Sequence, residues 1–155
     1  FLCGVAALVL ARPSRESLAA GAAIAGAGEA MRIWAAGHLE KGREVTTSGP
    51  YRFTRHPLYL GSAIITLGFV VASRSVTVAI LAAVYLALTY TAAISREEAF
   101  LTKQFGAAYP DYKAGRLGGV ARAFSVERAM RNGEHRAVLG LTAALAVLAA
   151  KLAIR

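Results

Sequence analysis

The sequence is poor in charge. Charged residues occupy 17% of its 155 positions, whereas about 25% is usual for a soluble domain. Hydrophobic residues make up 56%, and the mean hydropathy is +0.48. These values exclude an intrinsically disordered chain, and they indicate that part of the protein contacts a lipid bilayer rather than water.

Cysteine is almost absent. Cys3 stands alone, so no disulfide forms within the chain and a disulfide scaffold is excluded. We expect its side chain to pack as a small hydrophobic group. No Gly-X-Y repeat is present, which excludes a collagen-like protein. The first residue is Phe1 rather than Met, so we expect an N-terminal segment to precede it.

Acidic residues are scarce, with 9 Asp and Glu against 18 Lys and Arg, and the formal net charge is +9. Such a balance is typical of proteins that bind nucleic acid or anionic lipid. No basic run alternates with aromatic residues that stack on bases, so nucleic acid is not expected as a partner. We interpret the excess charge as membrane orientation and contact with lipid headgroups.

Two long apolar runs predict a hairpin of transmembrane helices. Residues 75–95 carry no charge, and about 20 apolar residues are enough for a helix to cross a bilayer. Residues 57–73 form a second uncharged run, which begins with Pro57 in a position suited to the first turn of a helix. Only Arg74 separates the two runs, so the helices must be antiparallel.

Three further segments complete the predicted fold. Residues 137–154 form a span if Lys151 extends to the interface, residues 17–37 form another, and residues 1–11 are the remainder of one more. The sequence therefore predicts one all-α domain over residues 1–155, an integral membrane bundle of about five transmembrane helices.

The distribution of Lys and Arg predicts the orientation of this bundle. Segment 38–56 holds four and segment 96–136 holds eight, and the hairpin places both segments on one side of the membrane. The other side receives five: Arg12, Arg15, Arg74, Lys151 and Arg155. Because short basic loops stay in the cytoplasm, we expect both segments to face it, in a plasma membrane of bacterial type.

The segment 17–37 contains both small and ionisable residues. Gly26-Ala27-Gly28 lacks the strand that a nucleotide-binding loop needs, so we interpret the pairs Gly21/Ala25 and Ala22/Gly26 as stripes for close helix packing. Glu29 and Arg32 are three residues apart on one helical face. Ionisable groups at this depth face a polar cavity or pair with each other, and the sequence leaves both alternatives open.

A first polar block runs from Ser48 to Gly61. Gly49-Pro50 predicts a turn, and Pro57 keeps the backbone of His56 out of the helix that follows. The free N–H groups of this helix start, together with Arg55, favour an anionic group such as a carboxylate.

A second polar block begins at the end of the 75–95 helix. Glu97 and Glu98 repel each other and oppose the helix dipole, so a cationic ligand would relieve both penalties. A solvated cluster neutralised by Arg96 is the alternative. Glu98 is the stronger candidate, because it shares a helical face with Leu101 and Phe105. From Phe100 to Ala108 the apolar residues favour a helix that lies along the interface.

Together the two blocks resemble a family. The residues that carry the resemblance are Gly49-Pro50-Tyr51, Arg55-His56-Pro57-Leu58-Tyr59-Leu60-Gly61, Glu97-Glu98, Leu101, Phe105-Gly106, Tyr109 and Tyr112. They look like the isoprenylcysteine carboxyl methyltransferase family, which shares its pattern with membrane phospholipid N-methyltransferases. The resemblance extends from about residue 28 to about residue 112, and the C-terminal helix lies outside it.

This resemblance implies a cytoplasmic pocket for S-adenosylmethionine and a lipophilic substrate that enters from the bilayer. We expect Arg55, Tyr59 and Glu98 to be catalytic and Glu29 and Arg32 to bind the substrate, without a metal ion. The residues expected to bind the cofactor are Tyr51, Arg55, His56, Pro57, Tyr59, Gly61, Glu97 and Glu98.

The resemblance favours an isoprenylcysteine-type carboxylate as methyl acceptor. A lipid amine or a small thiol would use the same cofactor site, because only the acceptor half of such a site differs. A non-catalytic membrane protein that retains the pocket is the alternative from another class. Neither the acceptor nor the oligomeric state follows from the sequence.

Overall fold

The computed structural model describes residues 2–119 and 121–154, so Phe1, Val120, Arg155 and the side chains of Leu2 and Cys3 lie outside the described part. All regular structure in the described residues is helical, which confirms the all-α prediction. The elements are α1 (Leu2–Leu10), α2 (Arg15–Ala36), η1 (Gly49–Arg52), α3 (Pro57–Ser73), α4 (Val76–Phe105), α5 (Ala108–Lys113), α6 (Val126–Arg131) and α7 (Glu134–Ala153).

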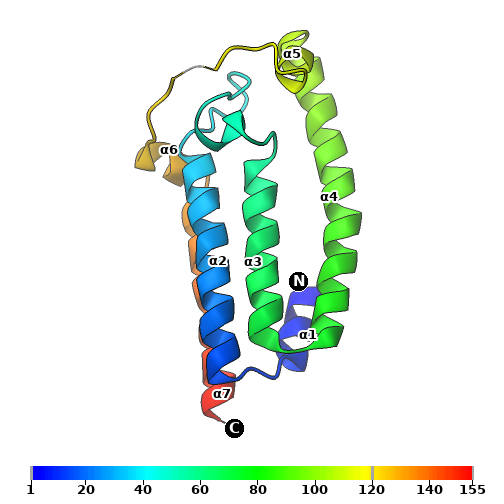
Figure 1. Cartoon of the computed structure of the whole chain (residues 1–155), viewed down its shortest axis with the longest axis vertical. Helices are drawn as coiled ribbons and strands as arrows, with labels where there is room; N and C mark the ends of the chain where they lie inside the picture. Colours follow the sequence, from blue (N-terminus) through cyan, green and yellow to red (C-terminus); the bar gives the residue numbers. More distant parts are fainter. Residues whose placement is uncertain (1, 120, 155) are drawn as a thin grey trace.

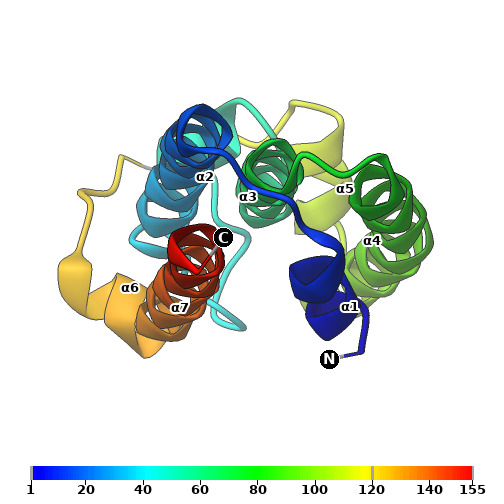
Figure 2. The same ribbon diagram turned by 90° about the horizontal axis from the view of Figure 1, so that it is seen from below.

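The long helices α2, α3, α4 and α7 run along the long axis of an elongated bundle (Figure 1). Seen from below, α2, α3 and α4 form a curved row, α7 packs beside α2, and α1 lies between α4 and α7 (Figure 2). Lys151 ties the end of α7 to α1, because its Nζ donates to the carbonyl of Leu8 at 2.9 Å.

Small residues hold α2 and α3 close together. A Cβ built on Gly21 would lie 2.4 Å from the carbonyl oxygen of Gly68, and one on Gly28 would lie 2.7 Å from that of Gly61. The Gly21/Ala25 stripe is thus confirmed as a packing surface. The Ala22/Gly26 stripe is wrong, since Gly26 is exposed and has nothing within contact distance of a Cβ.

The predicted hairpin between α3 and α4 is confirmed. Arg74 adopts a left-handed conformation at φ 48°, which turns the chain back after Ser73. Ser75 then caps α4 by accepting a hydrogen bond from the backbone N–H of Val78 at 3.4 Å. The two basic segments consequently lie at one end of the bundle.

Helix α4 is longer than the predicted span and ends only at Phe105, where Gly106 follows with φ 55°. The separate interfacial helix predicted from Phe100 to Ala108 is wrong, because residues 96–105 continue α4. Most of these residues are good helix formers, and no glycine or proline interrupts them. The paired glutamates therefore lie within the helix rather than at its C-terminus, which weakens the dipole argument made from the sequence.

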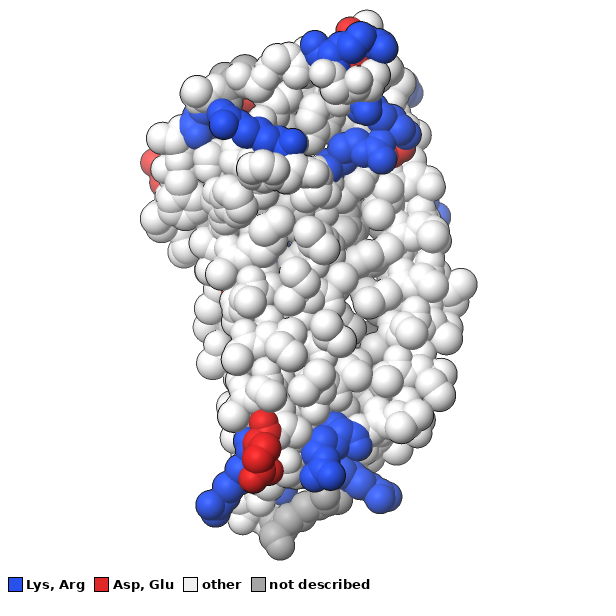
Figure 3. Space-filling model, in the orientation of Figure 1, with Lys and Arg blue, Asp and Glu red and all other residues white. Residues whose placement is uncertain are grey.

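The charges separate along the long axis. Lys, Arg, Asp and Glu side chains gather at both ends of the face shown, and the middle band is free of them (Figure 3). Among the described helices, α4 and α7 are long and apolar enough to cross a membrane, and α3 is apolar but shorter. All five segments predicted as spans are helices, and these properties indicate a membrane protein.

Candidate functional site

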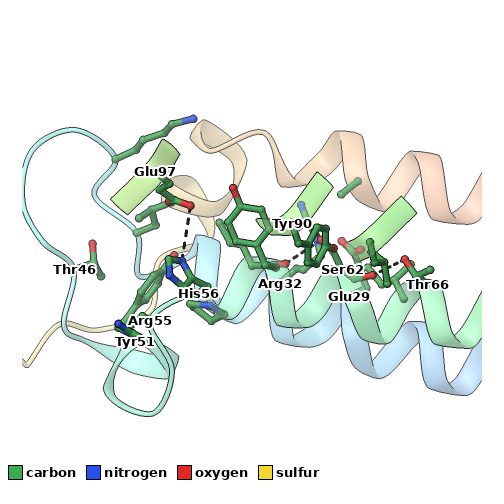
Figure 4. Close-up of a pocket in the computed structure, with 18 of the residues that line it drawn as sticks. Glu29, Arg32, Thr46, Tyr51, Arg55, His56, Ser62, Thr66, Tyr90 and Glu97 are labelled. Carbon is green, nitrogen blue, oxygen red and sulfur yellow. Dashed lines mark hydrogen bonds and ion pairs between the residues drawn. The ribbon is translucent and has the colours of Figure 1, made fainter. Parts of the chain in front are cut away.

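A cavity of about 1060 Å³ lies between α2, α3, α4 and α7 and extends under the loop that follows α2. Its polar end is built by η1, the start of α3 and the distal part of α4 (Figure 4). Its other end is mostly apolar, lined by Ile65 and Phe69 of α3 and by Leu141 and Ala144 of α7, with Glu29 and Thr66 as polar exceptions (Figure 4). The cavity thus joins a charged mouth to an apolar chamber.

The polar end holds a charged cluster around Glu98. Its Oε1 lies 3.3 Å from His56 Nε2 and 3.5 Å from Arg55 Nη1, and its Oε2 accepts from Lys113 Nζ at 2.6 Å. The sequence separated an anion-binding corner at Arg55 and His56 from a cation-binding corner at the glutamates. The structure instead brings all of them into one cluster, because α4 passes beside the start of α3.

Glu97 and Glu98 have different surroundings. Glu97 lines the cavity, its side chain is 43% exposed, and its carboxylate reaches His56 Nδ1 only at 3.9 Å. Glu98 is not among the lining residues, and it contacts the side chains of Arg55, His56 and Lys113. The carboxylate with spare capacity for a cationic ligand is therefore that of Glu97.

Aromatic rings lead from the charged cluster into the chamber. The ring of Tyr59 meets that of His56 edge-on, with centroids 5.9 Å apart, and meets that of Tyr90 at 5.2 Å. All three residues line the cavity or adjoin it from α3 and α4. Such a wall can align a flat or flexible molecule and keep water out of the chamber.

The remaining predicted cofactor residues take different positions. Tyr51 lines the cavity and is buried, burial raises its pKa, and its carbonyl accepts from the hydroxyl of Tyr112 at 2.6 Å. Pro57 occupies the first turn of α3 and also lines the cavity. Gly61 does not, and it packs against Gly28 in the helix interface.

Arg32 forms an ion pair that the sequence did not reveal. Its Nε lies 2.7 Å from Glu134 Oε1 and its Nη2 lies 3.2 Å from Glu134 Oε2, while Nη1 contacts the hydroxyl of Ser62. Pairing between Glu29 and Arg32 is wrong, because the partner comes from α7. The sequence held one hint that Glu134 could be this partner, its position as an acidic residue at the start of the last apolar helix.

Segment 121–132 clamps the loop that covers the polar end. The Glu40 carboxylate forms ion pairs with Arg128 at 2.8 Å and with Arg131 at 3.2 Å. Arg122 forms a third ion pair, with Glu44 at 2.7 Å. The hydrogen bond from Arg128 lowers the pKa of the Glu40 carboxyl, so this clamp stays charged. The sequence gave no signal for it, because its partners are about 80 to 90 residues apart.

The site offers both charge signs at one end and an apolar wall at the other. A small zwitterion with one carboxylate and one ammonium group suits the polar end, and an alkyl or prenyl chain suits the apolar end. Within residues 2–119 and 121–154, no group of three His, Cys, Asp or Glu side chains is placed to hold a metal ion.

The cavity combines a charged end with an apolar wall, and comparison with known proteins defines the class of protein. The chain matches the phospholipid methyltransferase family over residues 17–108, more than half of its length, and belongs to this family. The resemblance drawn from the sequence is confirmed at this level. The finer resemblance, to the isoprenylcysteine carboxyl methyltransferases in particular, stays a prediction.

Two curated proteins are similar to the chain over 76 residues. They are the nickel-cobalt-cadmium resistance protein NccN of Alcaligenes xylosoxydans xylosoxydans, at 36% identity, and the cobalt-zinc-cadmium resistance protein CzcN of Cupriavidus metallidurans, at 37%. The aligned part is 48% of this chain but only 36% and 35% of those proteins, so the chain spans about a third of their length. No solved structure matches the chain.

Proposed function

We propose that this protein is an integral membrane methyltransferase that uses S-adenosylmethionine to methylate a lipophilic acceptor. The observation that carries the proposal is the single cavity in which Arg55, His56 and Glu97 meet at one end while the other end is apolar. Membership in the phospholipid methyltransferase family supports the reaction class.

The residues at the polar end fit the cofactor. Its carboxylate suits Arg55, whose side chain is 43% exposed and has one carboxylate partner at 3.5 Å, and the adjacent His56. Its ammonium suits Glu97, whose carboxylate is hydrogen-bonded to Tyr59 and lies 3.9 Å from His56 Nδ1, without a Lys or Arg partner among the described ion pairs. When bound, S-adenosylmethionine supplies an activated methyl group on sulfur.

The chain's own residues have the tasks of alignment and water exclusion. Tyr59 and Tyr90 form the wall between the polar end and the chamber, and Tyr51 closes it from η1. Orientation of two reactants is worth several orders of magnitude in rate, and no nucleophilic side chain is needed for a direct displacement. Arg55, Tyr59 and Glu98 remain our assignments for the catalytic cluster, with Glu98 holding Arg55 and His56 in place.

The acceptor would enter from the bilayer. The apolar half of the cavity is lined by α3, α4 and α7. The motif resemblance favours an isoprenylcysteine-type carboxylate, with a phospholipid amine or a small thiol as alternatives. The surrounding membrane lipids are the other expected partner.

Calorimetric titration of the detergent-purified protein with S-adenosylmethionine tests the proposal. We expect saturable binding with one site, followed by transfer of a labelled methyl group to lipids extracted from the host membrane. Binding without any transfer would favour the alternative of a non-catalytic protein that retains the pocket, and absence of binding would reject the cofactor assignment.

Replacement of Arg55 by Lys is expected to weaken S-adenosylmethionine binding by about tenfold, because a planar guanidinium contacts a carboxylate through two hydrogen bonds and an ammonium does not. The measurement is the same titration. Arg116→Lys is the matched control, since Arg116 pairs with Asp111 on an exposed surface. Equal affinity of Arg55→Lys and wild type for S-adenosylmethionine would contradict this contact and indicate that Arg55 only anchors the protein at the lipid interface.

The proposed orientation places both basic segments, 38–56 and 96–136, on the cytoplasmic side of the plasma membrane. In a Cys3→Ser background, we expect an impermeant maleimide to label Arg12→Cys in intact cells. Lys41→Cys and Ala114→Cys, which lie at the opposite end of the bundle, should react only after lysis. Labelling of either of these two in intact cells would contradict the orientation.

A further inference from the structure

A loop borders the polar end of the cavity. Residues 38–48, which join α2 to η1, are named the lid loop here, and the loop lines the cavity with residues 39–42 and 44–46. Thr46 is 5% exposed, and Figure 4 shows it on this loop, at the end of the cavity where Tyr51, Arg55 and Glu97 lie. The lid loop therefore lies against the space proposed for S-adenosylmethionine.

Segment 121–132 holds the lid loop on one side. Three ion pairs join Glu40 and Glu44 of the loop to arginines of this segment. In addition, the side-chain amide of Asn132 donates to the carbonyl of Leu39 at 2.9 Å. Movement of the loop away from this segment would have to break several charged contacts together, so this side is suited to be a hinge.

Helix α4 holds the lid loop on the other side, through a neutral contact at the exposed turn of the loop. Gln104 Nε2 donates to the carbonyl of Gly42 at 2.7 Å, and both residues are exposed. Gly42 has φ 74°, a conformation that favours glycine, so the turn offers its backbone carbonyl to α4. A neutral hydrogen bond changes an equilibrium constant by about two- to tenfold. This contact is therefore the easier one to break.

Gln104 stands at the edge of the cavity mouth. Along α4 it follows Glu97, Phe100 and Leu101 at helical spacing, so it shares their face of the helix. Those three residues line the cavity, and the Glu97 side chain is 43% exposed while Phe100 is 59% exposed. The polar end is thus reached from solvent along the seam between α4 and the lid loop, and Gln104 bridges that seam.

We propose that the lid loop opens and closes over the polar end, with segment 121–132 as its hinge and Gln104 as the positioning residue that latches it. The inference rests on the proposed function, because S-adenosylmethionine is the molecule that the lid would enclose. A closed lid excludes water and retains the bound molecule during the reaction. Segment 121–132 lies outside residues 17–108, which match the family, so the hinge is supplied by the C-terminal part of this chain.

The first test measures lid opening without cofactor, on the full chain in nanodiscs of phosphatidylcholine. In a Cys3→Ser background, the rate at which an impermeant maleimide labels Thr46→Cys reports how often the lid opens, because Thr46 is buried. We expect Gln104→Met to raise this rate about two- to tenfold, since a thioether cannot donate to the Gly42 carbonyl. Gln104→Lys should restore slow labelling, because its ammonium can donate. Lys103→Met, at the exposed neighbouring position, is the matched control and should leave the rate unchanged.

The second test measures exchange of S-adenosylmethionine. We expect Gln104→Met to release it about two- to tenfold faster than wild type. In a variant with Cys3→Ser, Lys41→Cys and Gln104→Cys, bis-maleimidoethane joins the lid loop to α4. Cross-linking after loading should slow release by about tenfold or more, and cross-linking before loading should slow uptake. N-ethylmaleimide on the same variant is the control, because it modifies both thiols without joining them.

The outcomes separate this inference from the proposed function. The inference is overturned by an unchanged labelling rate in Gln104→Met, by an equal rise in Lys103→Met, or by release as fast after cross-linking as after N-ethylmaleimide. Absence of S-adenosylmethionine binding in wild type would instead overturn the proposed function, and the lid would be judged by the labelling rates alone. If Thr46→Cys does not fold, Val45→Cys, which also lines the cavity, takes its place with the same expected rates.

Discussion

Replacement of Glu97 by Gln is expected to weaken S-adenosylmethionine binding by about ten- to a hundredfold. Of the paired glutamates Glu97 is the one that lines the cavity, and among the described residues its one ion-pair distance, to His56 Nδ1, is 3.9 Å. A charge-assisted hydrogen bond is worth about 1.5–3 kcal/mol, and each 1.4 kcal/mol is about tenfold in affinity. Because the Glu97 side chain is 43% exposed and Gln can still accept the hydrogen bond from Tyr59, its neutralisation should leave the thermal unfolding temperature almost unchanged.

Glu98→Gln provides the comparison within the same turn. Glu98 contacts Lys113, His56 and Arg55, so its neutralisation should lower both the unfolding temperature and the cofactor affinity, the latter through displaced Arg55 and His56. Calorimetric titration and thermal unfolding of both variants in detergent make the measurement. Unaltered cofactor affinity in both variants would reject the pocket assignment. If Glu98→Gln loses stability but keeps its cofactor affinity, the cluster around Glu98 has a structural role only.

Replacement of Gly21 by Ala is expected to destabilise the fold by about 1–3 kcal/mol, as is usual when a methyl group is forced into a packed interface. Its Cβ would lie 2.4 Å from the carbonyl oxygen of Gly68 and 2.6 Å from the backbone nitrogen of Ala72. Both atoms belong to the backbone of α3, so the two helices must separate. Thermal unfolding in detergent, followed by circular dichroism, makes the measurement.

Gly26→Ala is the matched control on the same helix. Nothing lies within 4 Å of its Cβ, and alanine is favoured over glycine inside a helix by about 0.5–1 kcal/mol. We expect it to be neutral or slightly stabilising. A loss of stability in Gly26→Ala equal to that in Gly21→Ala would contradict the close packing of α2 against α3.

The same two glycines show where sequence reasoning ends. Small residues at four-residue spacing occur on two faces of α2, and both predict close packing equally well. The face that carries Gly21 is buried because Gly61 and Gly68 of α3 come opposite to it. Which stripe meets another helix depends on the rotation of α2 in the bundle, and no local pattern determines that rotation.

For the ionisable residues of the site, too, the sequence predicted one part and the tertiary structure showed the other. The sequence predicted that Glu29 and Arg32 matter because charges are rare in apolar helices. It could not supply Glu134 as the partner of Arg32, since that contact joins residues 102 positions apart. That pairing leaves the Glu29 carboxylate without a hydrogen-bonding partner among the described residues.

The sequence by itself determined the long helices and the class of this protein. Runs of uncharged residues determine helices because backbone groups in an apolar medium must bond within their own segment, and the one-residue connection at Arg74 determines the hairpin. The ordered blocks around the hairpin determined the family. Only the tertiary structure decided that Arg55, His56 and Glu98 form one cluster and that Glu97 faces the cavity, because these distances depend on how α4 lies against α3.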